Sequence, residues 1–282
     1  MSSIQFHKIL RITSIVGATA AIAGTPVRAS AQGPQGGAPV YDLTHPRPAN
    51  ADSSDEAGAK TQYEFKSRAD SISWVRNRAI AEQSRGFRLV VSLQDRHVWA
   101  IVDDDTVLSA PAAVASGRTL EYAHRKFTFN TPRGIRTVLA KEADPIWQPP
   151  EWLYVETAEE YDLKLDHLNN NSRIKLSDGR ILTMKDGEAG VLENGEFAAL
   201  PTDEHIVFDN TLYIPPMGSK NRKVDGELGK YRLILGDGYL LHGTPFKESI
   251  GLAATHGCVR LRDEDIEWLY EHVPVGTKVY IY

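Results

Sequence analysis

Short runs of apolar and β-branched residues, separated by polar turns, dominate the chain from residue 88 onward. Runs 88–93 and 98–102 flank a polar segment, a pattern that predicts a β-hairpin. Runs 107–114 and 135–140 predict further strands. Many short strands with very few helical segments are typical of a barrel or a sandwich. The chain is therefore predicted to be mostly β, a barrel or sandwich with one or two short helices.

Helical spacing of apolar residues occurs twice. Residues 71–86 are predicted to form an amphipathic helix leading into the folded part, because apolar side chains recur there at helical intervals. These side chains are Ile72, Val75, Ala79 and Ile80. Asp263 is predicted to cap a second, short helix that Pro274 and Gly276 end. A final strand is expected at 277–281.

The first 31 residues are predicted to be an export signal. Lys8 and Arg11 give a positive start, an apolar stretch follows, and residues 29–31 offer an A-x-A cleavage site. The competing interpretation is an uncleaved N-terminal anchor. Export predicts a location in the periplasm or cell wall. Residues 32–70 are rich in proline, glycine and charge, so they are predicted to be a flexible linker.

The charge balance argues against nucleic acid as a partner. The whole chain has a formal charge of -5, and loss of residues 1–31 would leave 29 basic and 37 acidic residues. A phosphate-binding protein needs a basic face. Residues 87–282 suit one catalytic domain, with an insertion at about 157–212 where turn sequences are closely spaced. A lid over the site and a surface decoration are both open for this insertion.

Cys258 is the only cysteine, and His242 stands sixteen positions upstream. A single thiol cannot close an internal disulfide, and it lacks the paired cysteines of a typical structural zinc site. A thiol needs a nearby base to become a good nucleophile, and histidine is the usual one. His242 follows the apolar runs 231–235 and 239–241 and is expected at a strand end, where a rigid sheet can aim it.

The segment Thr255-His256-Gly257-Cys258-Val259-Arg260 resembles the [S/T]-x-G-C-[IV]-R signature of the YkuD-type L,D-transpeptidases. His242-Gly243-Thr244 resembles the upstream histidine segment of that family. Other features follow in the family's order, among them Trp147-x-Pro149-Pro150 and Glu227-Leu228-Gly229-Lys230-Tyr231. The resemblance runs from about residue 87 to 282 and is closest to the Gram-negative periplasmic branch. It leaves out residues 1–86 and the insertion.

The resemblance implies a reaction on peptidoglycan stem peptides. The thiolate of Cys258 would attack the amide before the D-alanine at position four and form a thioester. The amine of a second stem would then give a 3→3 cross-link, while a D-amino acid or a lipoprotein lysine are alternative acceptors. Neither a cofactor nor a metal is expected. A carbapenem is expected to acylate Cys258, and penicillins are expected to do so poorly.

The resemblance also assigns roles within the site. His242 is expected to be the general base, with the carbonyl of Gly243 replacing a third triad side chain. Gly257 is expected to permit the turn that points its own amide and that of Cys258 at the oxyanion. His256 is expected to support the site through its amide or its ring.

Two roles are left open. Arg260 either binds a substrate carboxylate or braces the loop by pairing with an acid such as Asp263. Thr255 either orients His256 or caps the loop through its hydroxyl.

Three rival functions remain. The same site would act as an L,D-carboxypeptidase or a cross-link-cleaving amidase if water were the acceptor. A zinc site made of His242, His256 and Cys258 lacks a clear fourth ligand. A non-catalytic wall-binding module would be expected to have lost the cysteine or the histidine, and this chain has both.

Overall fold

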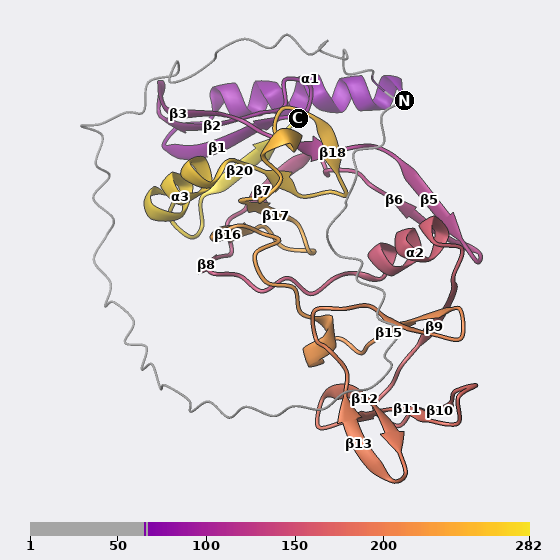
Figure 1. Ribbon diagram of the computed structural model, residues 1–282. Coiled ribbons are helices and arrows are strands. Elements are labelled where there is room, and N and C mark those ends of the chain that lie inside the picture. The colour runs from indigo at the N-terminus through magenta and orange to yellow at the C-terminus, as the bar shows by residue number, and fades with distance from the viewer. Residues whose placement is uncertain (1–64, 66) are drawn as a thin grey trace. The chain divides into compact units, whose positions relative to one another are not determined.

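The computed structural model describes Phe65 and residues 67–282 (Figure 1). The predicted signal at 1–31 and most of the predicted linker lie outside the described residues. The described α-helices are α1 (Arg68–Gln83), α2 (Glu151–Glu160) and α3 (Asp263–His272), with short 3-10 helices η1 (Lys220–Arg222) and η2 (Lys247–Ser249). None of these helices combines the length and apolar composition that crossing a membrane requires.

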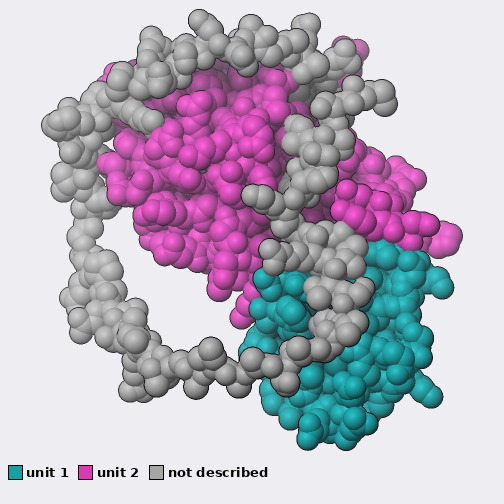
Figure 2. Space-filling model, viewed as in Figure 1, with its two compact units in different colours: residues 1–40, 163–221 teal, residues 41–162, 222–282 magenta. Residues whose placement is uncertain are grey.

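The described residues form two compact units, which Figure 2 colours separately. One contains residues 163–221, and the other contains the described residues up to 162 together with 222–282. All predicted site residues belong to the second unit. Its largest sheet has five strands in the order β3 (Asp105–Pro111), β2 (His97–Val102), β1 (Phe87–Ser92), β20 (Lys278–Ile281) and β7 (Gly134–Thr137).

A second sheet of this unit carries the predicted histidine. Its order is β19 (Val259–Arg260), β17 (Leu240–His242), β16 (Tyr231–Ile234) and β8 (Ala140–Ala143). Two small sheets complete the unit. They pair β18 (Ala253–Thr255) with β4 (Val114–Ala115), and β5 (Thr119–Tyr122) with β6 (Arg125–Thr128). No closed barrel is found in the described residues, so the sandwich alternative of the mostly β prediction is the one confirmed.

The main hydrophobic core is built from the two larger sheets and α3. Fully buried side chains come from all three, for example Leu89, Leu241 and Leu269. Both faces of β1 are covered: Leu89 and Val91 join this core, and Val90 joins a second cluster under α1. The predicted hairpin of β1 and β2 is present, and β1 also pairs in parallel with β20.

The helix predicted at 71–86 is α1, and its predicted apolar face is correct only in part. Ile72 and Val75 are 57% and 59% exposed, whereas Trp74, Ile80 and Ala81 contact the outer face of the five-stranded sheet. In Figure 1, α1 lies along β1–β3. The docking side is chosen by the aromatic side chains of β20 and the C-terminus, which helical spacing does not reveal.

The start of α3 also differs from the prediction. Asp263 is the first residue of the helix, and Arg262 occupies the N-cap position without a side-chain hydrogen bond. Three acidic residues fill the first turn instead. Their charges interact favourably with the positive end of the helix dipole, which supplies part of what a capping side chain would.

The unit at 163–221 has its own small core. Its first sheet orders β10 (Arg173–Lys175), β11 (Ile181–Lys185), β12 (Glu188–Glu193) and β13 (Glu196–Ala199). Its second orders β14 (Ile206–Phe208), β15 (Thr211–Ile214) and β9 (Lys164–His167). Buried Leu182, Val191 and Ile206 belong to one cluster. The closely spaced hairpins expected in this region are therefore folded around apolar side chains, and their role stays open.

The docking of α1 can be tested by removing side chains from its two faces. Trp74→Ala removes an indole ring that meets Tyr282 edge-on at 5.9 Å, and we expect it to lower the free energy of unfolding by about 2 kcal/mol. Ile72→Ala, on the exposed face, is the matched control and should stay within about 0.5 kcal/mol. Urea unfolding measures both, and equal effects would contradict the docking side.

Candidate active site

The pairing of β17 with β19 brings the predicted base and nucleophile to one face of a sheet. The two strands are parallel, with Leu241 opposite Val259 and His242 opposite Arg260. Leu241 and Val259 are buried in the main core at 0% and 1% exposure. Because side chains alternate along a strand, His242 and Arg260 point to the other face. Cys258 immediately precedes Val259, so the same alternation directs it to the face of His242.

This face carries a row of polar and charged side chains across four strands. Arg260, His242, Arg232 and Glu142 lie in register on β19, β17, β16 and β8. Arg232 Nε donates to Glu142 Oε2 at 2.9 Å, so one of the two arginines is paired. The histidine is therefore flanked by a paired arginine on one side and Arg260 on the other.

His242 is held in the tautomer that a general base needs. Its Nδ1 lies 2.6 Å from the carbonyl oxygen of Gly243. A carbonyl only accepts hydrogen bonds, so Nδ1 carries the proton and Nε2 carries the lone pair. Burial lowers the pKa of His242 to about 3, and the positive charge of Arg260 lowers it further in the same direction. The ring is neutral and able to accept a proton at any pH near neutrality.

The thiol of Cys258 is half-buried, and burial raises its pKa. Arg260 and Arg232 oppose that shift because positive charges favour the thiolate. Its Sγ lies 3.8 Å from the carbonyl oxygen of Gly238, a distance that suits a weak S–H hydrogen bond. In the resting site the thiol and the imidazole are therefore both neutral.

Hydroxyl groups fasten the loop on which Cys258 stands. Thr255 Oγ1 donates to the carbonyl of Cys258 at 2.6 Å and accepts from the N–H of Gly257 at 3.2 Å. Thr131 Oγ1 donates to the carbonyl of Gly257 at 2.9 Å. Of the two roles left open for Thr255, the structure shows the second, in which its hydroxyl caps the loop. His256 is oriented by other residues.

Gly257 has a φ of +151°, in the region that favours glycine. A Cβ at this position would lie 3.1 Å from Cε1 of Tyr239. The amides of Gly257 and Cys258 were both expected to donate to the oxyanion. The Gly257 amide instead donates to Thr255. The N–H of Cys258 has no hydrogen-bond acceptor within the described part of the chain, so it is the donor left for an oxyanion.

The ring of His256 is anchored by helix α2, which the sequence analysis did not predict. His256 Nε2 lies 2.9 Å from Glu156 Oε2, and the imidazole stacks on Trp152 at 3.8 Å between ring centroids. The helix signal was present in the sequence, since Pro149-Pro150-Glu151 suits a helix start. The contact of this helix with a loop a hundred residues away has no sequence signal.

Arg260 is 8% exposed, yet its guanidinium makes no hydrogen bond or ion pair to the described residues. Its Nε is buried without a partner, and the group lies over the Phe246 ring at 5.8 Å. The bracing pair with Asp263 is not formed. Nearby Glu227 has its pKa raised to about 7 by burial, with Arg260 opposing that shift. The arginine is a buried cation with free donors.

Gly243 has no room for a side chain. A Cβ there would lie 2.8 Å from Asp263 Oδ1 and 3.2 Å from Cα of Gly229. Asp237, the acid nearest to His242 in the upstream sequence, is 81% exposed and pairs with Arg136 at 3.1 Å. The group that orients His242 is therefore the Gly243 carbonyl, and not a carboxylate or a hydroxyl.

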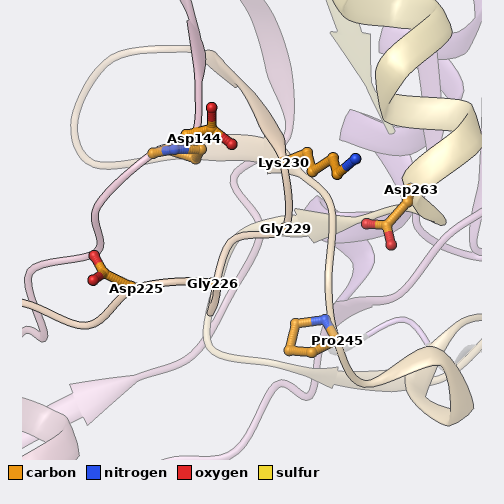
Figure 3. A pocket seen from close by; sticks show the side chains of 8 residues that line it. Asp144, Asp225, Gly226, Gly229, Lys230, Pro245 and Asp263 are labelled. Carbon is orange, nitrogen blue, oxygen red and sulfur yellow. The ribbon is translucent and has the colours of Figure 1, made fainter. Parts of the chain in front are cut away.

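A cavity of about 360 Å³ is lined by residues that include Asp225, Gly226 and Pro245 (Figure 3). Its lining includes Asp144, Lys230 and Asp263, together with Gly229, which lies against Gly243. Neither His242 nor Cys258 lines it, so it is separate from the nucleophile. No cluster of three or more His, Cys, Asp or Glu side chains suited to a metal ion occurs in residues 65 and 67–282.

Comparison with known proteins places these residues in one family. The family model described as the L,D-transpeptidase catalytic domain matches residues 86–281, more than half of the chain. The probable L,D-transpeptidase YbiS of Escherichia coli is 54% identical over 55 residues, which is 20% of this chain and 18% of that protein. The putative L,D-transpeptidase YkuD of Bacillus subtilis is 39% identical over 64 residues, 22% of this chain and 39% of that protein. The chain therefore matches only a minor part of each relative.

Solved structures give a weaker likeness. An L,D-transpeptidase from Xylanimonas cellulosilytica aligns with 71% of this chain and 62% of its own, at 17% identity and a TM-score of 0.37. The catalytic domain of the Enterococcus faecium L,D-transpeptidase acylated by ertapenem aligns with 71% of this chain and 99% of its own, at 13% identity and a TM-score of 0.36.

The depressed pKa of His242 predicts how stability depends on pH. Below about pH 6.5 the unfolded histidine binds a proton, whereas the folded one stays neutral down to about pH 3. The unfolded state thus gains protons as pH falls, and stability is lost across this window. We expect the free energy of unfolding of the wild type, relative to His242→Asn, to fall by up to about 1.4 kcal/mol per pH unit. Urea unfolding from pH 4 to 8 tests this, and parallel curves would contradict it.

Proposed function

The chain belongs to the L,D-transpeptidase catalytic-domain family, and on this premise we propose that it is an exported cysteine L,D-transpeptidase acting on peptidoglycan stem peptides. The observation that carries the proposal is the shared face of β17 and β19, on which His242 lies in register with Arg260 and the alternation of side chains directs Cys258 to the same side. The fixed Nδ1–H tautomer of His242 adds the lone pair that a thiol requires.

In the first half-reaction the proton of Cys258 Sγ passes to His242 Nε2. Sulfur attacks the carbonyl carbon of the amide between the diamino acid at position three and the D-alanine at position four. The oxyanion accepts a hydrogen bond from the Cys258 amide. Its collapse breaks the C–N bond, and His242 returns the proton to the departing D-alanine amine. A thioester then links the shortened peptide to Cys258.

In the second half-reaction an amine attacks the thioester. The amine gives a proton to His242 as its nitrogen bonds to the carbonyl carbon, and the C–S bond breaks. The sulfur leaves as thiolate and recovers the proton from His242. A second stem peptide as acceptor yields the 3→3 cross-link, and a D-amino acid or lipoprotein lysine gives the related exchange products. The two half-reactions need no cofactor, because the thioester conserves the free energy of the cleaved amide.

Arg260 is proposed to bind the carboxylate of the departing D-alanine. It is buried, has free donors and lies opposite His242 in the sheet. A guanidinium fits a carboxylate through two parallel hydrogen bonds, and a buried cation without a partner is costly unless a ligand supplies one. The substrate would thus complete the ion pair that the protein leaves unmade.

The location of the enzyme follows from its substrate and from the predicted signal at residues 1–31. Peptidoglycan lies outside the cytoplasmic membrane, so the proposed reaction takes place in the periplasm or the cell wall. Export with cleavage after residue 31 predicts a mature N-terminus at Gln32.

The nucleophile and the base are tested by intact-protein mass spectrometry with a disaccharide-tetrapeptide. We expect the wild type to form an acyl-enzyme, release D-alanine and produce a 3→3 dimer. Cys258→Ala should form none of these, and His242→Ala should acylate slower by about 10²–10⁴-fold because proton transfer is lost. A carbapenem serves as a second acyl donor whose mass should appear on Cys258.

Two outcomes would change the proposal. Tripeptide as the only product, with or without an added amine, would assign an L,D-carboxypeptidase. Wild-type activity in Cys258→Ala would remove cysteine chemistry altogether.

The role of Arg260 is tested with a donor peptide whose D-alanine carboxylate is amidated. For the wild type we expect amidation to raise KM by about tenfold or more, since a charge-assisted hydrogen bond contributes about 1.5–3 kcal/mol. Arg260→Gln should show the raised KM with both peptides. Comparing the two enzymes with the two peptides is a double-mutant cycle, which isolates the interaction between Arg260 and the D-alanine carboxylate. If amidation costs both enzymes equally, the carboxylate binds elsewhere.

A further inference from the structure

His256 is held by a helix far away in the sequence. Its imidazole stacks on Trp152 with planes 12° apart, and it meets the edge of Phe129 at 4.4 Å between centroids. Its Nε2 lies 2.9 Å from Glu156 Oε2, and the two side chains are 13% and 20% exposed. The stacking on Trp152, the edge contact with Phe129 and the hydrogen bond to Glu156 together restrict the position and orientation of the ring.

Glu156 dictates which nitrogen of His256 carries the proton. An ionised carboxylate only accepts hydrogen bonds, so Nε2 carries the proton toward Glu156. The other nitrogen, Nδ1, has no partner among the described residues. His242 has the opposite arrangement, with its proton on Nδ1. The two histidines of the site are therefore set in different tautomers by different acceptors.

Glu156 is itself held in place. Its second oxygen, Oε1, accepts from the guanidinium of Arg118, which immediately precedes β5. That guanidinium also lies over Phe129 at 5.8 Å. Arg118, Glu156 and His256 thus form a chain of charged and polar contacts, and Phe129 contacts both ends of it. Each carboxylate oxygen has one partner, so the carboxylate has little freedom to rotate.

The chain of contacts ends next to the nucleophile. Only Gly257 separates His256 from Cys258. The N–H of Gly257 and the carbonyl of Cys258 are both hydrogen-bonded to the Thr255 hydroxyl. The His256 ring is joined to the backbone one residue before Gly257, so the contacts that hold the ring also hold the backbone that leads to Cys258. The position of the thiol is thereby coupled to the carboxylate on α2.

We propose that Glu156 is a positioning residue for Cys258, acting by holding the His256 ring in its Nε2–H tautomer against Trp152. The inference rests on the proposed function only in taking Cys258 as the nucleophile. It assigns to α2 a role that the cysteine motif does not contain. Loss of the carboxylate would free the ring, and a displacement of about 1 Å of a reacting atom can cost about a hundredfold in rate.

The test uses the full chain with three substitutions. Glu156→Ala removes the acceptor. Glu156→Gln keeps an oxygen that can accept from Nε2–H, and so provides the conservative rescue. Glu151→Ala is the matched control, because Glu151 lies on the same helix and pairs with Arg125 of β6 but does not contact His256. Thermal unfolding of each protein measures how far the substitution affects folding.

Two readouts are needed. Long-range ¹H–¹⁵N correlation spectra report the tautomer of the His256 ring, with the signals assigned by their loss in His256→Gln. Alkylation by iodoacetamide and acylation by a carbapenem report the reactivity of Cys258, the only thiol in the chain. Neither the spectra nor the alkylation needs the peptide substrate, so they remain informative if the proposed transpeptidation fails.

We expect Glu156→Ala to lose the Nε2–H preference and to acylate about ten- to a hundredfold slower, the range set by a misplaced nucleophile. Glu156→Gln should keep the tautomer and most of the rate, and Glu151→Ala should match the wild type. Unchanged tautomer and acylation rate in Glu156→Ala would overturn the proposal. Equal losses in Glu156→Ala and Glu151→Ala would also overturn it, since they would assign the effect to the packing of α2.

Discussion

The parallel pairing of β17 with β19 is the constraint on which the site depends. His242 lies sixteen positions before Cys258, and two apolar side chains buried in the main core, Leu241 and Val259, fix the face of the sheet on which each lies. A slip of one residue in either strand would turn its functional side chain into the core and expose its apolar one. The same burial that stabilises the sandwich therefore sets the register of the face that carries His242 and Arg260.

Burial, more than the charges on that face, keeps the resting site neutral. Burial and Arg260 hold the pKa of His242 far below neutrality, while burial raises the pKa of Cys258. A preformed thiolate–imidazolium pair is thus disfavoured before substrate binds. In the proposed mechanism a substrate carboxylate at Arg260 offsets the nearby positive charge, which makes His242 a stronger base at the moment it is needed. Substrate binding and nucleophile activation would then be linked through one arginine.

The loop that carries Cys258 is held from several directions. Its N-terminal side follows β18, which pairs with β4, and its C-terminal side enters β19. Thr131 holds the Gly257 carbonyl from a third segment, and Glu156 holds the His256 ring from α2. A nucleophile needs its supporting residues to be as rigid as its own backbone. The contacts come from parts of the chain that are distant in sequence but converge on four consecutive residues.

The sequence by itself determined the family, the mostly β class and most of the local elements. A single cysteine in a glycine-containing motif, an upstream histidine at a strand end and the alternating apolar runs were enough to predict the mostly β fold, the family and the residues of the motif. Tertiary structure decided the rest: which face of α1 is buried, that Arg260 leaves Asp263 unpaired, and that Glu156 on α2 orients His256. Local periodicity and motifs depend on neighbours along the chain, whereas these features depend on which distant side chains share a buried space, and a single sequence carries no signal for that.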